Sequence, residues 1–579
     1  MCIRDSPGSS GHGGESAGVV HPDVGRRLAE VGGPVKVWVF FTDKGLESPA
    51  AEAAALERFA AALPERTRQR RELRRSRPGL VDVDDLPLAG SYVSAVAQLG
   101  APVHVESPWL NTLSATVDAA QLAALQELPF VERVQLVGRS VPLATGLAAP
   151  VPGDGDGSGF YGIAQAQLDL INLPALHAQG FTGQGVVIGI LDTGFRTTHQ
   201  AFTNPAKPLT VVAAMDFIND DLEVGLEPGD DPTQDDHGTI ILGTLAAYDP
   251  NNLVGAAYDA SFILCKTEDV TQEVQAEEDY YVAGLQFIEL NGGDVATSSV
   301  GYIDWYTQAD LDGLTAVTTV AVNAATANGV HCCTAAGNST HDVDPATSSL
   351  LAPADAFDVI TVGAVEITGE VSHFSSDGPT ADGRVKPELL TMGDEAASVW
   401  PDDDSSLSYS SGTSMSTPQM AGVVACLTQA HPEWSVATMR SQLFDAADYF
   451  GEPKPDPVFV TGYGIVDAAG ALPSGLALAP VTPGLAGQIN SIQVTNATPG
   501  QPAFFAWALL QGPQAVPGCP GLLADVQHVV LIQFAFADNA GVAATTTVIP
   551  PGGSGLTVFL QAVELASCQV SNLVTAALP

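Results

Sequence analysis

Positive charge is the scarcest property of this sequence. Its 579 residues hold 22 Lys and Arg against 66 Asp and Glu, a formal net charge of −44 at pH 7. A surface that acidic repels nucleic acid and anionic membranes and keeps a protein soluble. We therefore expect no nucleic-acid partner.

Long hydrophobic runs are also missing. No apolar stretch reaches the roughly 18 residues needed to cross a bilayer, so we expect no membrane span. The start, MCIRDSPGSSGHGGES, has no apolar segment of the kind found in secretory signals. Because its first residues resemble a cloning remnant, we expect the native N-terminus to be missing, and we expect residues 1–33 to be disordered.

Cysteine is scarce, with 7 residues in the chain. Cys519 and Cys568 lie in a tail rich in Gly and Pro, where we expect them to form a disulfide. A disulfide implies an oxidising compartment, so we expect an extracellular or cell-surface protein. Four others sit in apolar stretches and are expected to be small buried hydrophobes. Those four are Cys265, Cys332, Cys333 and Cys426.

The length predicts two to four domains. Residues 34–140 contain strand-like PVKVWVFFT, an Ala-rich helix that continues or breaks into the basic run ERTRQRRELRRSR, two strands, a second helix capped by Asp118 and a closing strand. The order strand, helix, strand, strand, helix, strand is typical of a ferredoxin-like α+β domain. Residues 141–160 are rich in Gly, Pro and Ala, which indicates an exposed linker open to proteases.

Residues 161–473 alternate apolar strands such as VVIGILDT and DVITVGAV with helical segments. Nearly continuous apolar strands indicate a parallel sheet covered on both faces, so this part is expected to be a doubly wound α/β domain. Residues 474–579 contain short strands separated by turns such as PGCPG and IPPGGSG, which favours an all-β sandwich.

Three candidate catalytic residues follow or precede the strands of the α/β domain. Asp192 ends the strand of VVIGILDTGF, His237 precedes an apolar helix in DDHGTIILG, and Ser414 opens another helix in SGTSMSTPQMAG. Each alone is explained as a turn, a packed residue or a helix cap. Together they supply a hydroxyl nucleophile, an imidazole base and a carboxylate to orient the imidazole.

The motifs DTGF, HGT and GTSMSTP, in that order, resemble the three signatures of the subtilisin-like serine proteases. The resemblance covers roughly residues 161–473. It implies a serine endopeptidase of the peptidase S8 family that works through an acyl-enzyme on polypeptide substrates and needs no cofactor for its chemistry.

The resemblance also makes Asn338, in TAAGNST, the side-chain donor of the oxyanion hole, partnered by the backbone N–H of Ser414. The alternative for Asn338 is a glycosylation site, since Asn338-Ser339-Thr340 matches the acceptor motif.

Substrate binding, by the same resemblance, is expected to use strand addition. One segment would lie beside the substrate backbone and a second would line the pocket for the residue before the cut. The first segment is Ser299, Val300 and Gly301, and the second is Ala335, Ala336 and Gly337.

The sequence departs from the family pattern in two places. HGTI carries Ile240 where relatives usually have a histidine, which puts local packing in question rather than catalysis. The loop AAYDPNNLVGAA is shorter than one that binds calcium in many relatives. Oxygen ligands are available at Asp249 and Asn251 and in the acidic stretches 230–236 and 402–404, so a structural calcium is possible. Solvated acidic surface turns are the favoured explanation, and we name no metal residue.

An N-terminal domain of this kind resembles the family's propeptide, which assists folding and then inhibits the protease. Residues 1–159 hold 15 Lys and Arg against 19 Asp and Glu, whereas the remainder holds 7 against 47. Complementary charge favours docking of the two parts. We therefore predict a self-processing zymogen, cut between about 140 and 160, with its own propeptide as an intramolecular inhibitor.

Two other functions compete with a secreted, monomeric endopeptidase. A catalytically silent binding or adhesion protein would use the same scaffold, although such homologues usually lose a catalytic residue, and all are present here. An acyl-transferring ligase would need an altered nucleophile, which GTSMSTP does not show. Because His237 must be unprotonated to act as a base, we expect activity at neutral pH or above.

Overall fold

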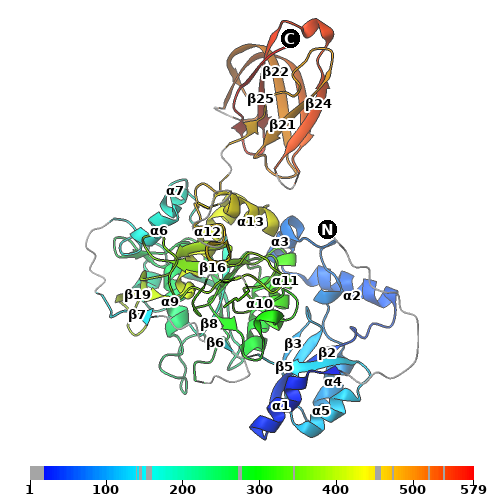
Figure 1. Cartoon of the computed structure of the whole chain (residues 1–579), viewed down its shortest axis with the longest axis vertical. Helices are drawn as coiled ribbons and strands as arrows, with labels where there is room; N and C mark the ends of the chain where they lie inside the picture. The colour runs from blue at the N-terminus through cyan, green and yellow to red at the C-terminus, as the bar shows by residue number, and fades with distance from the viewer. Residues whose placement is uncertain are drawn as a thin grey trace.

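The computed structural model describes residues 19–138, 140–141, 146–151, 159–271, 277–342, 344, 346–449, 458–472, 475–519, 522–538 and 541–578. Figure 1 shows three parts along the chain: an N-terminal domain in blue, a central domain from cyan to yellow, and a C-terminal domain in orange and red. No helix in the described part of the chain is long and apolar enough to cross a membrane.

The N-terminal domain is built on a mixed sheet in the order β1-β5-β2-β4-β3. Its central strand β2 is buried throughout and pairs antiparallel with both β4 and β5. The strands are β1 (Val19–Val20), β2 (Val35–Phe41), β3 (Val103–Ser107), β4 (Thr112–Val117) and β5 (Val131–Leu136).

The helices of this domain begin and end where the local sequence dictates. Ser48 caps α2, whose first residue is Pro49, and Pro64 separates α2 from α3, so the basic run forms its own helix. Asp118 caps α5 and accepts from the backbone N–H of Gln121. The helices are α1 (Pro22–Val31), α2 (Pro49–Ala62), α3 (Glu65–Arg74), α4 (Gly90–Gln98) and α5 (Ala119–Gln126).

The expectation that residues 1–33 are disordered is wrong for the part the structure describes. Residues 19–33 contain β1 and α1, and β1 pairs parallel with β5. Val24 of α1 is fully buried in the core of the domain. Burial of the face of α1 that carries Val24 supplies the free energy that orders residues 19–33. The remainder of the expectation, residues 1–18, lies outside the described residues.

The central domain contains a parallel sheet in the order β17-β16-β15-β13-β8-β12-β9. Every neighbouring pair in it is parallel, and strand order departs from chain order, as in doubly wound folds. Its strands are β8 (Val187–Asp192), β9 (Thr210–Asp216), β12 (Ser261–Lys266), β13 (Val295–Ser298), β15 (His331–Ala335), β16 (Ile360–Val365) and β17 (Leu389–Met392).

Helices cover both faces of this sheet. Ile188 and Ile190 of β8 pack with α9 (Asp236–Ala246) and α12 (Thr413–Ala430), while Val187 and Leu191 pack on the opposite face with α10 (Glu277–Leu290) and α11 (Val317–Ala327). The smaller helices are α6 (Gln165–Leu170), α7 (Leu173–His177), α8 (Gln200–Thr203), α13 (Val436–Asp445) and α14 (Val458–Thr461).

Short strands flank the sheet. β6 pairs antiparallel with β14, and β7 pairs antiparallel with β19. The linker expected at 141–160 is therefore paired to the central domain at these points. The bounds are β6 (Ser140–Val141), β7 (Gly146–Leu147), β10 (Tyr248–Asp249), β11 (Leu253–Val254), β14 (Gly301–Tyr302), β18 (Ala396–Val399) and β19 (Leu407–Ser411).

The C-terminal domain consists of antiparallel strands in two sheets. One has the order β20-β21-β24, and the other β23-β22-β25-β26, with β27 paired to β25. Ile492, Phe505 and Leu560 from the two sheets share one core. The strands are β20 (Ala477–Leu478), β21 (Ile489–Thr495), β22 (Pro502–Ala515), β23 (Leu523–Phe536), β24 (Ala543–Val548), β25 (Thr557–Glu564), β26 (Gln569–Val570) and β27 (Val574–Ala577).

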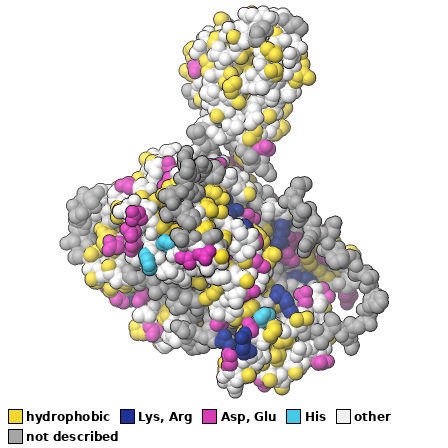
Figure 2. All heavy atoms as spheres, in the orientation of Figure 1, with side chains coloured by type: hydrophobic (Ala, Val, Ile, Leu, Met, Phe, Trp, Pro, Cys, Tyr) yellow, Lys and Arg dark blue, Asp and Glu magenta, His cyan; other side chains and the backbone are white. Residues whose placement is uncertain are grey.

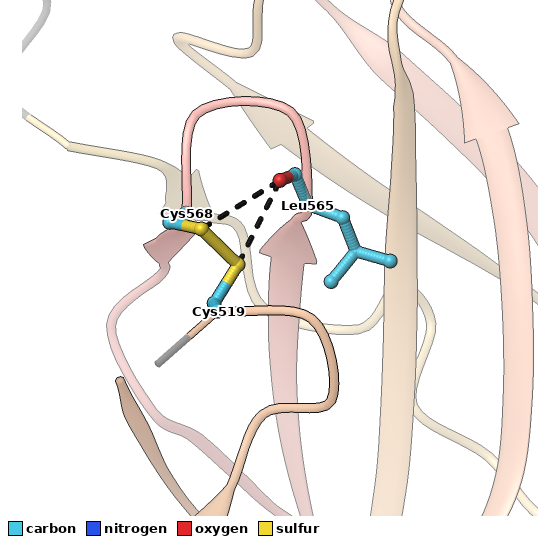
Figure 3. The surroundings of a disulfide bond; sticks show 3 residues. All are labelled: Cys519, Leu565 and Cys568. Carbon is cyan, nitrogen blue, oxygen red and sulfur yellow. Dashed lines mark hydrogen bonds between the residues drawn. A yellow bond between two sulfur atoms is a disulfide. The ribbon is translucent and has the colours of Figure 1, made fainter. Parts of the chain in front are cut away.

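The cysteines divide by domain. Cys519 and Cys568 form a disulfide with a Cα–Cα distance of 5.4 Å, and both sulfurs lie 3.7 Å from the carbonyl oxygen of Leu565 (Figure 3). The four cysteines of the central domain are buried thiols: Cys265, Cys332, Cys333 and Cys426.

We predict that the disulfide contributes substantially to the stability of the C-terminal domain. It joins residues 49 positions apart, and loop-closure entropy of that length corresponds to about 4 kcal/mol. The Cys519→Ser/Cys568→Ser chain should therefore show a lower free energy of unfolding for this domain by calorimetry. The transition of the central domain is the internal control and should not move. An unchanged C-terminal transition would refute the prediction.

Candidate active site

A hydrogen bond between Asp192 and His237 lies at the carboxyl edge of the sheet. Asp192 ends β8, and its side chain is fully buried. His237 Nδ1 donates to Asp192 Oδ1 at 2.7 Å, and the backbone N–H of Thr193 donates to the same oxygen at 2.8 Å. Such donors stabilise a carboxylate in the protein interior.

Two glycines bring His237 to this position. His237 is the second residue of α9. A Cβ on the next residue, Gly238, would lie 2.1 Å from the carbonyl oxygen of Gly194, and Gly194 itself has φ +151°. Only glycine permits so close an approach of Gly238 to the carbonyl oxygen of Gly194. Gly238 therefore fixes the start of α9, with His237, against the turn that follows Asp192.

The environment of His237 favours its protonated form. Burial alone lowers the pKa of the imidazole, but the charge of Asp192 and the hydrogen bond to it outweigh burial and hold the pKa of His237 above its ordinary value. The Nδ1–H is committed to Asp192, so Nε2 is the atom left to exchange a proton.

Ser414 is the second residue of α12 and is fully buried. Its Oγ donates to the carbonyl oxygen of Ser299 at 3.3 Å, and Ser299 Oγ donates to the carbonyl oxygen of Ser414 at 3.0 Å. His237 Nε2 is buried and has no hydrogen-bond partner among the residues that the structure describes. In this form of the chain the serine hydroxyl is thus bonded to Ser299 and not to His237.

Asn338 lies beside the start of α12 with a defined orientation. Its Oδ1 accepts from the backbone N–H of Thr413 at 2.9 Å and from Thr413 Oγ1 at 2.8 Å. Because the amide oxygen is held by Thr413, the amide NH₂ group is directed to the other side. Sequence reasoning missed Thr413; its place directly before Ser414 in the GTS motif was the available signal.

The two segments expected to bind substrate both line the same edge. Gly301 of β14 lies two residues after Ser299 and pairs with Val141 of β6. Ala335 and Ala336 are buried, and a Cβ on Gly337, whose φ is +122°, would lie 2.6 Å from Ser376 Oγ. An extended chain is therefore already paired to the first segment in this structure.

The same chain is paired on both sides of Ser414. After β6 it continues to β7, where Gly146 pairs with Ser411, the residue that precedes Gly412 and α12. The described strands β6 and β7 therefore pair with the two segments, 301–302 and 410–411, that lie near the candidate nucleophile.

The N-terminal domain contacts the start of α10 through buried polar groups that sequence reasoning missed. Glu278 accepts from Trp38 Nε1 at 3.0 Å and from the backbone N–H of Gly138 at 2.7 Å. Asp279 forms an ion pair with Lys36 at 2.8 Å. Burial raises the pKa of the Glu278 carboxyl despite these hydrogen bonds. The partners lie far apart in sequence, so no local pattern indicates them.

The described acidic clusters have protein partners. Asp216, Asp221 and Glu227 lie close enough to hold a cation, but Lys266 Nζ lies 2.8 Å from both Asp216 and Asp230. The ammonium group of Lys266 therefore already supplies positive charge beside this cluster.

The loops considered for calcium are similarly satisfied. Asp249 Oδ2 accepts from Asn252 Nδ2 at 3.1 Å, and Asp403 Oδ1 accepts from the backbone N–H of Ser405 and Ser406 at 2.8 and 2.6 Å. These are hydrogen bonds of ordinary acidic turns.

Comparison with known proteins places this geometry in a family. The model of the Subtilase family matches residues 183–464, and that of the Peptidase S8 propeptide domain, Bacteroidota, matches residues 36–149. Subtilisin from Bacillus pumilus is 30% identical over 314 residues, which cover 54% of this chain and 98% of the relative. Subtilisin E from Bacillus subtilis (strain 168) is 29% identical over 379 residues, 65% of this chain and 84% of the relative.

A solved structure shares the fold. The crystal structure of fervidolysin from Fervidobacterium pennivorans, described as a keratinolytic enzyme related to subtilisin, has a TM-score of 0.50 and is 19% identical. The match covers 91% of this chain and 70% of that one.

The chain belongs to the subtilase family. It is a serine endopeptidase with a subtilisin-like parallel-sheet domain and a propeptide domain, and it is made as a zymogen. The family resemblance noted from DTGF, HGT and GTSMSTP is thereby confirmed. Catalysis in this family requires no cofactor.

We predict that His237 titrates above about pH 6.5, the ordinary value for histidine, because Asp192 stabilises the imidazolium. In Asp192→Asn the charge is lost and the pKa of His237 should fall. NMR of histidine-labelled chains, with His237→Gln to assign the signal, measures both values. Asp525→Asn, which removes a carboxylate from the C-terminal domain, is the control. A His237 signal that does not move in Asp192→Asn would show that the contact carries no charge stabilisation.

Proposed function

We propose that peptide hydrolysis is carried out by Asp192, His237 and Ser414. The observation that carries the proposal is the 2.7 Å hydrogen bond from His237 Nδ1 to buried Asp192, which leaves Nε2 as the free base at the edge where Ser414 lies. For reaction, Ser414 Oγ must exchange Ser299 for His237 as its hydrogen-bond partner. Bonds of this kind are often long or absent until substrate is bound.

The chemical steps follow from these positions. Ser414 Oγ attacks the scissile carbonyl carbon while His237 Nε2 takes its proton. The imidazolium, stabilised by Asp192, then donates that proton to the leaving amine, and the C–N bond breaks to leave an acyl-enzyme. Water repeats the sequence, with His237 again as base, and releases the acid.

Asn338 and the backbone N–H of Ser414 serve as the oxyanion hole in this proposal. The amide of Asn338 is fixed through its oxygen by Thr413, so its NH₂ group is preoriented. A preorganised donor of this type contributes about 10²–10³ in rate.

The proposed substrate strand lies where β6 lies now. Ser299, Val300 and Gly301 would pair with the substrate backbone. The second segment, 335–337, would line the pocket for the residue before the cut. Pairing of Gly301 with Val141 supports this path.

The flanking domains complete the zymogen. We infer a ferredoxin-like propeptide domain over 34–140 and a β-sandwich over 474–579, with the protease domain at 161–473 between them. We further infer that the enzyme acts as a monomer outside the cell, in keeping with the disulfide between Cys519 and Cys568.

A catalytically silent binding protein is the second candidate, and Ser414→Ala separates the two. The variant should lower kcat toward casein or a chromogenic peptide by about 10⁶-fold, since a missing nucleophile costs that much in this type of triad. Ser411→Ala, three residues away in the same segment, should stay within about tenfold of the parent. Equal activity of the parent and Ser414→Ala would eliminate the proposed mechanism.

Self-cleavage should occur between Val141 and Gly146, because the chain is paired on either side of Ser414 at these residues. N-terminal sequencing of the mature protease should find a first residue within 142–146. The Ser414→Ala chain should remain whole under the same conditions. A first residue outside 142–146, or cleavage of the purified Ser414→Ala chain, would contradict this route.

A further inference from the structure

Helix α3 carries arginines on every fourth residue: Arg66, Arg70 and Arg74. This spacing places the three side chains along one face of a helix. The face lies against the protease domain, at the ends of α10 and α11, whereas the sheet of the propeptide domain contacts the start of α10 (Figure 1). Figure 2 shows Lys and Arg side chains gathered where the two domains meet.

Arg70 is the central contact. Its Nη1 donates to the carbonyl oxygens of Glu289 and Gly293 at 3.0 and 2.7 Å, and its Nη2 pairs with the carboxylate of Glu289. Arg71, beside it, donates to the same carboxylate through Nε and Nη2 at 2.9 and 3.0 Å. Glu289 is thus shared by two guanidinium groups.

Asp294 is shared in the same way by the two outer arginines. Arg66 and Arg74 each pair with its carboxylate. Arg66 also donates to the carbonyl oxygens of Gly292 and Gly185 at 2.9 and 2.8 Å. We name the acceptor set the arginine-binding surface: the carboxylates of Glu289 and Asp294 and the carbonyl oxygens of Gly185, Glu289, Gly292 and Gly293.

The acceptors around Arg70 favour a guanidinium group, because they combine one carboxylate with two carbonyl oxygens. The side chains of Arg70 and Arg74 are 1% and 3% exposed, and that of Glu289 is 0% exposed. Charges so deeply buried are tolerated only when each is paired and hydrogen-bonded. A guanidinium group can bond a carboxylate and two carbonyls at once, which an ammonium group cannot do in the same geometry. The helix-end carbonyls add the negative end of the α10 dipole.

The α3 contact is independent of the strands β6 and β7. It comes from residues 65–74, well before β6 and β7, and a cut between 141 and 146 breaks none of its hydrogen bonds. We propose that the arginine-binding surface is a second docking site of the protease, separate from the substrate cleft, which recognises arginines on every fourth residue of a helix and keeps α3 bound after the linker is cut.

The proposal rests on the proposed self-cleavage and adds a stage to it. Cutting frees the strand at Ser414, but the propeptide domain remains anchored at the far end of α10. Full activity then requires the α3 contact to open.

The test compares release of the propeptide domain from cut chains. Arg70→Ala/Arg74→Ala should release it at least tenfold faster than the parent, measured by size exclusion and by the onset of peptide hydrolysis. Arg58→Ala/Arg68→Ala is the matched control, since Arg68 is 43% exposed and pairs with Glu65 of its own helix. It should release at the parent rate. Equal release from all three chains would overturn the proposal.

A second measurement guards against misfolded variants. A peptide of residues 64–77 should bind the mature protease at least tenfold more tightly than a control peptide of the same composition. In the control, the arginines no longer occupy every fourth residue along one face of the helix. Equal binding would mean that the acidic domain only attracts positive charge, and would overturn the proposal.

Failure of self-cleavage is seen separately, as an intact chain on a denaturing gel. In that case the linker of the Ser414→Ala chain is cut with added elastase, alone and combined with Arg70→Ala/Arg74→Ala or Arg58→Ala/Arg68→Ala. The propeptide domain should again be released at least tenfold faster only with Arg70→Ala/Arg74→Ala, and equal release from all three chains would overturn the proposal.

Discussion

The buried carboxylate of Asp192 is the constraint on which the rest of the candidate active site depends. A charged group at the end of a fully buried strand is stable only if donors meet it there. Thr193 and His237 are those donors. The need to satisfy Asp192 therefore fixes the start of α9, the tautomer of His237 and the side from which a nucleophile must approach.

Helix α12 provides the other fixed element. It is buried from Thr413 to Thr428 and packs beneath several strands of the sheet. Because its first turn cannot move without disturbing that core, Ser414 and the oxygen-held amide of Asn338 are positioned by packing rather than by loop structure. This edge of the sheet is therefore held by packing at the start of α12.

The uneven distribution of charge along the chain favours binding of the propeptide domain to the protease domain. Most of the basic residues lie in the first 159 residues, and the protease domain is strongly acidic. The structure shows that this asymmetry is not only a diffuse attraction, since Lys36, Arg70 and Arg71 form ion pairs with carboxylates of the protease domain. Both ends of α10 are therefore held by the propeptide domain, through Glu278 and Asp279 at its start and Glu289 at its end.

The sequence predicted the candidate site better than it predicted the contacts around it. Asp192, His237 and Ser414 each sit in a local motif, and the apolar strands before them indicate which edge they share. Arg70 and Glu289, by contrast, are separated by 219 positions, and either alone is typical of a solvated helix face. The sequence also failed to predict that residues 19–33 are ordered, and the reason is related. Val24 packs in a core that is assembled from strands distant in the sequence.

The measurement that tests the account most directly is covalent labelling of the mature enzyme with a serine-directed phosphonate, followed by peptide mapping. Attack by an activated hydroxyl requires the base and the oxyanion donors together, so one label is expected, on Ser414, and it should be lost in His237→Ala. A label on another serine, or on Ser414 at the same rate without His237, would contradict the account.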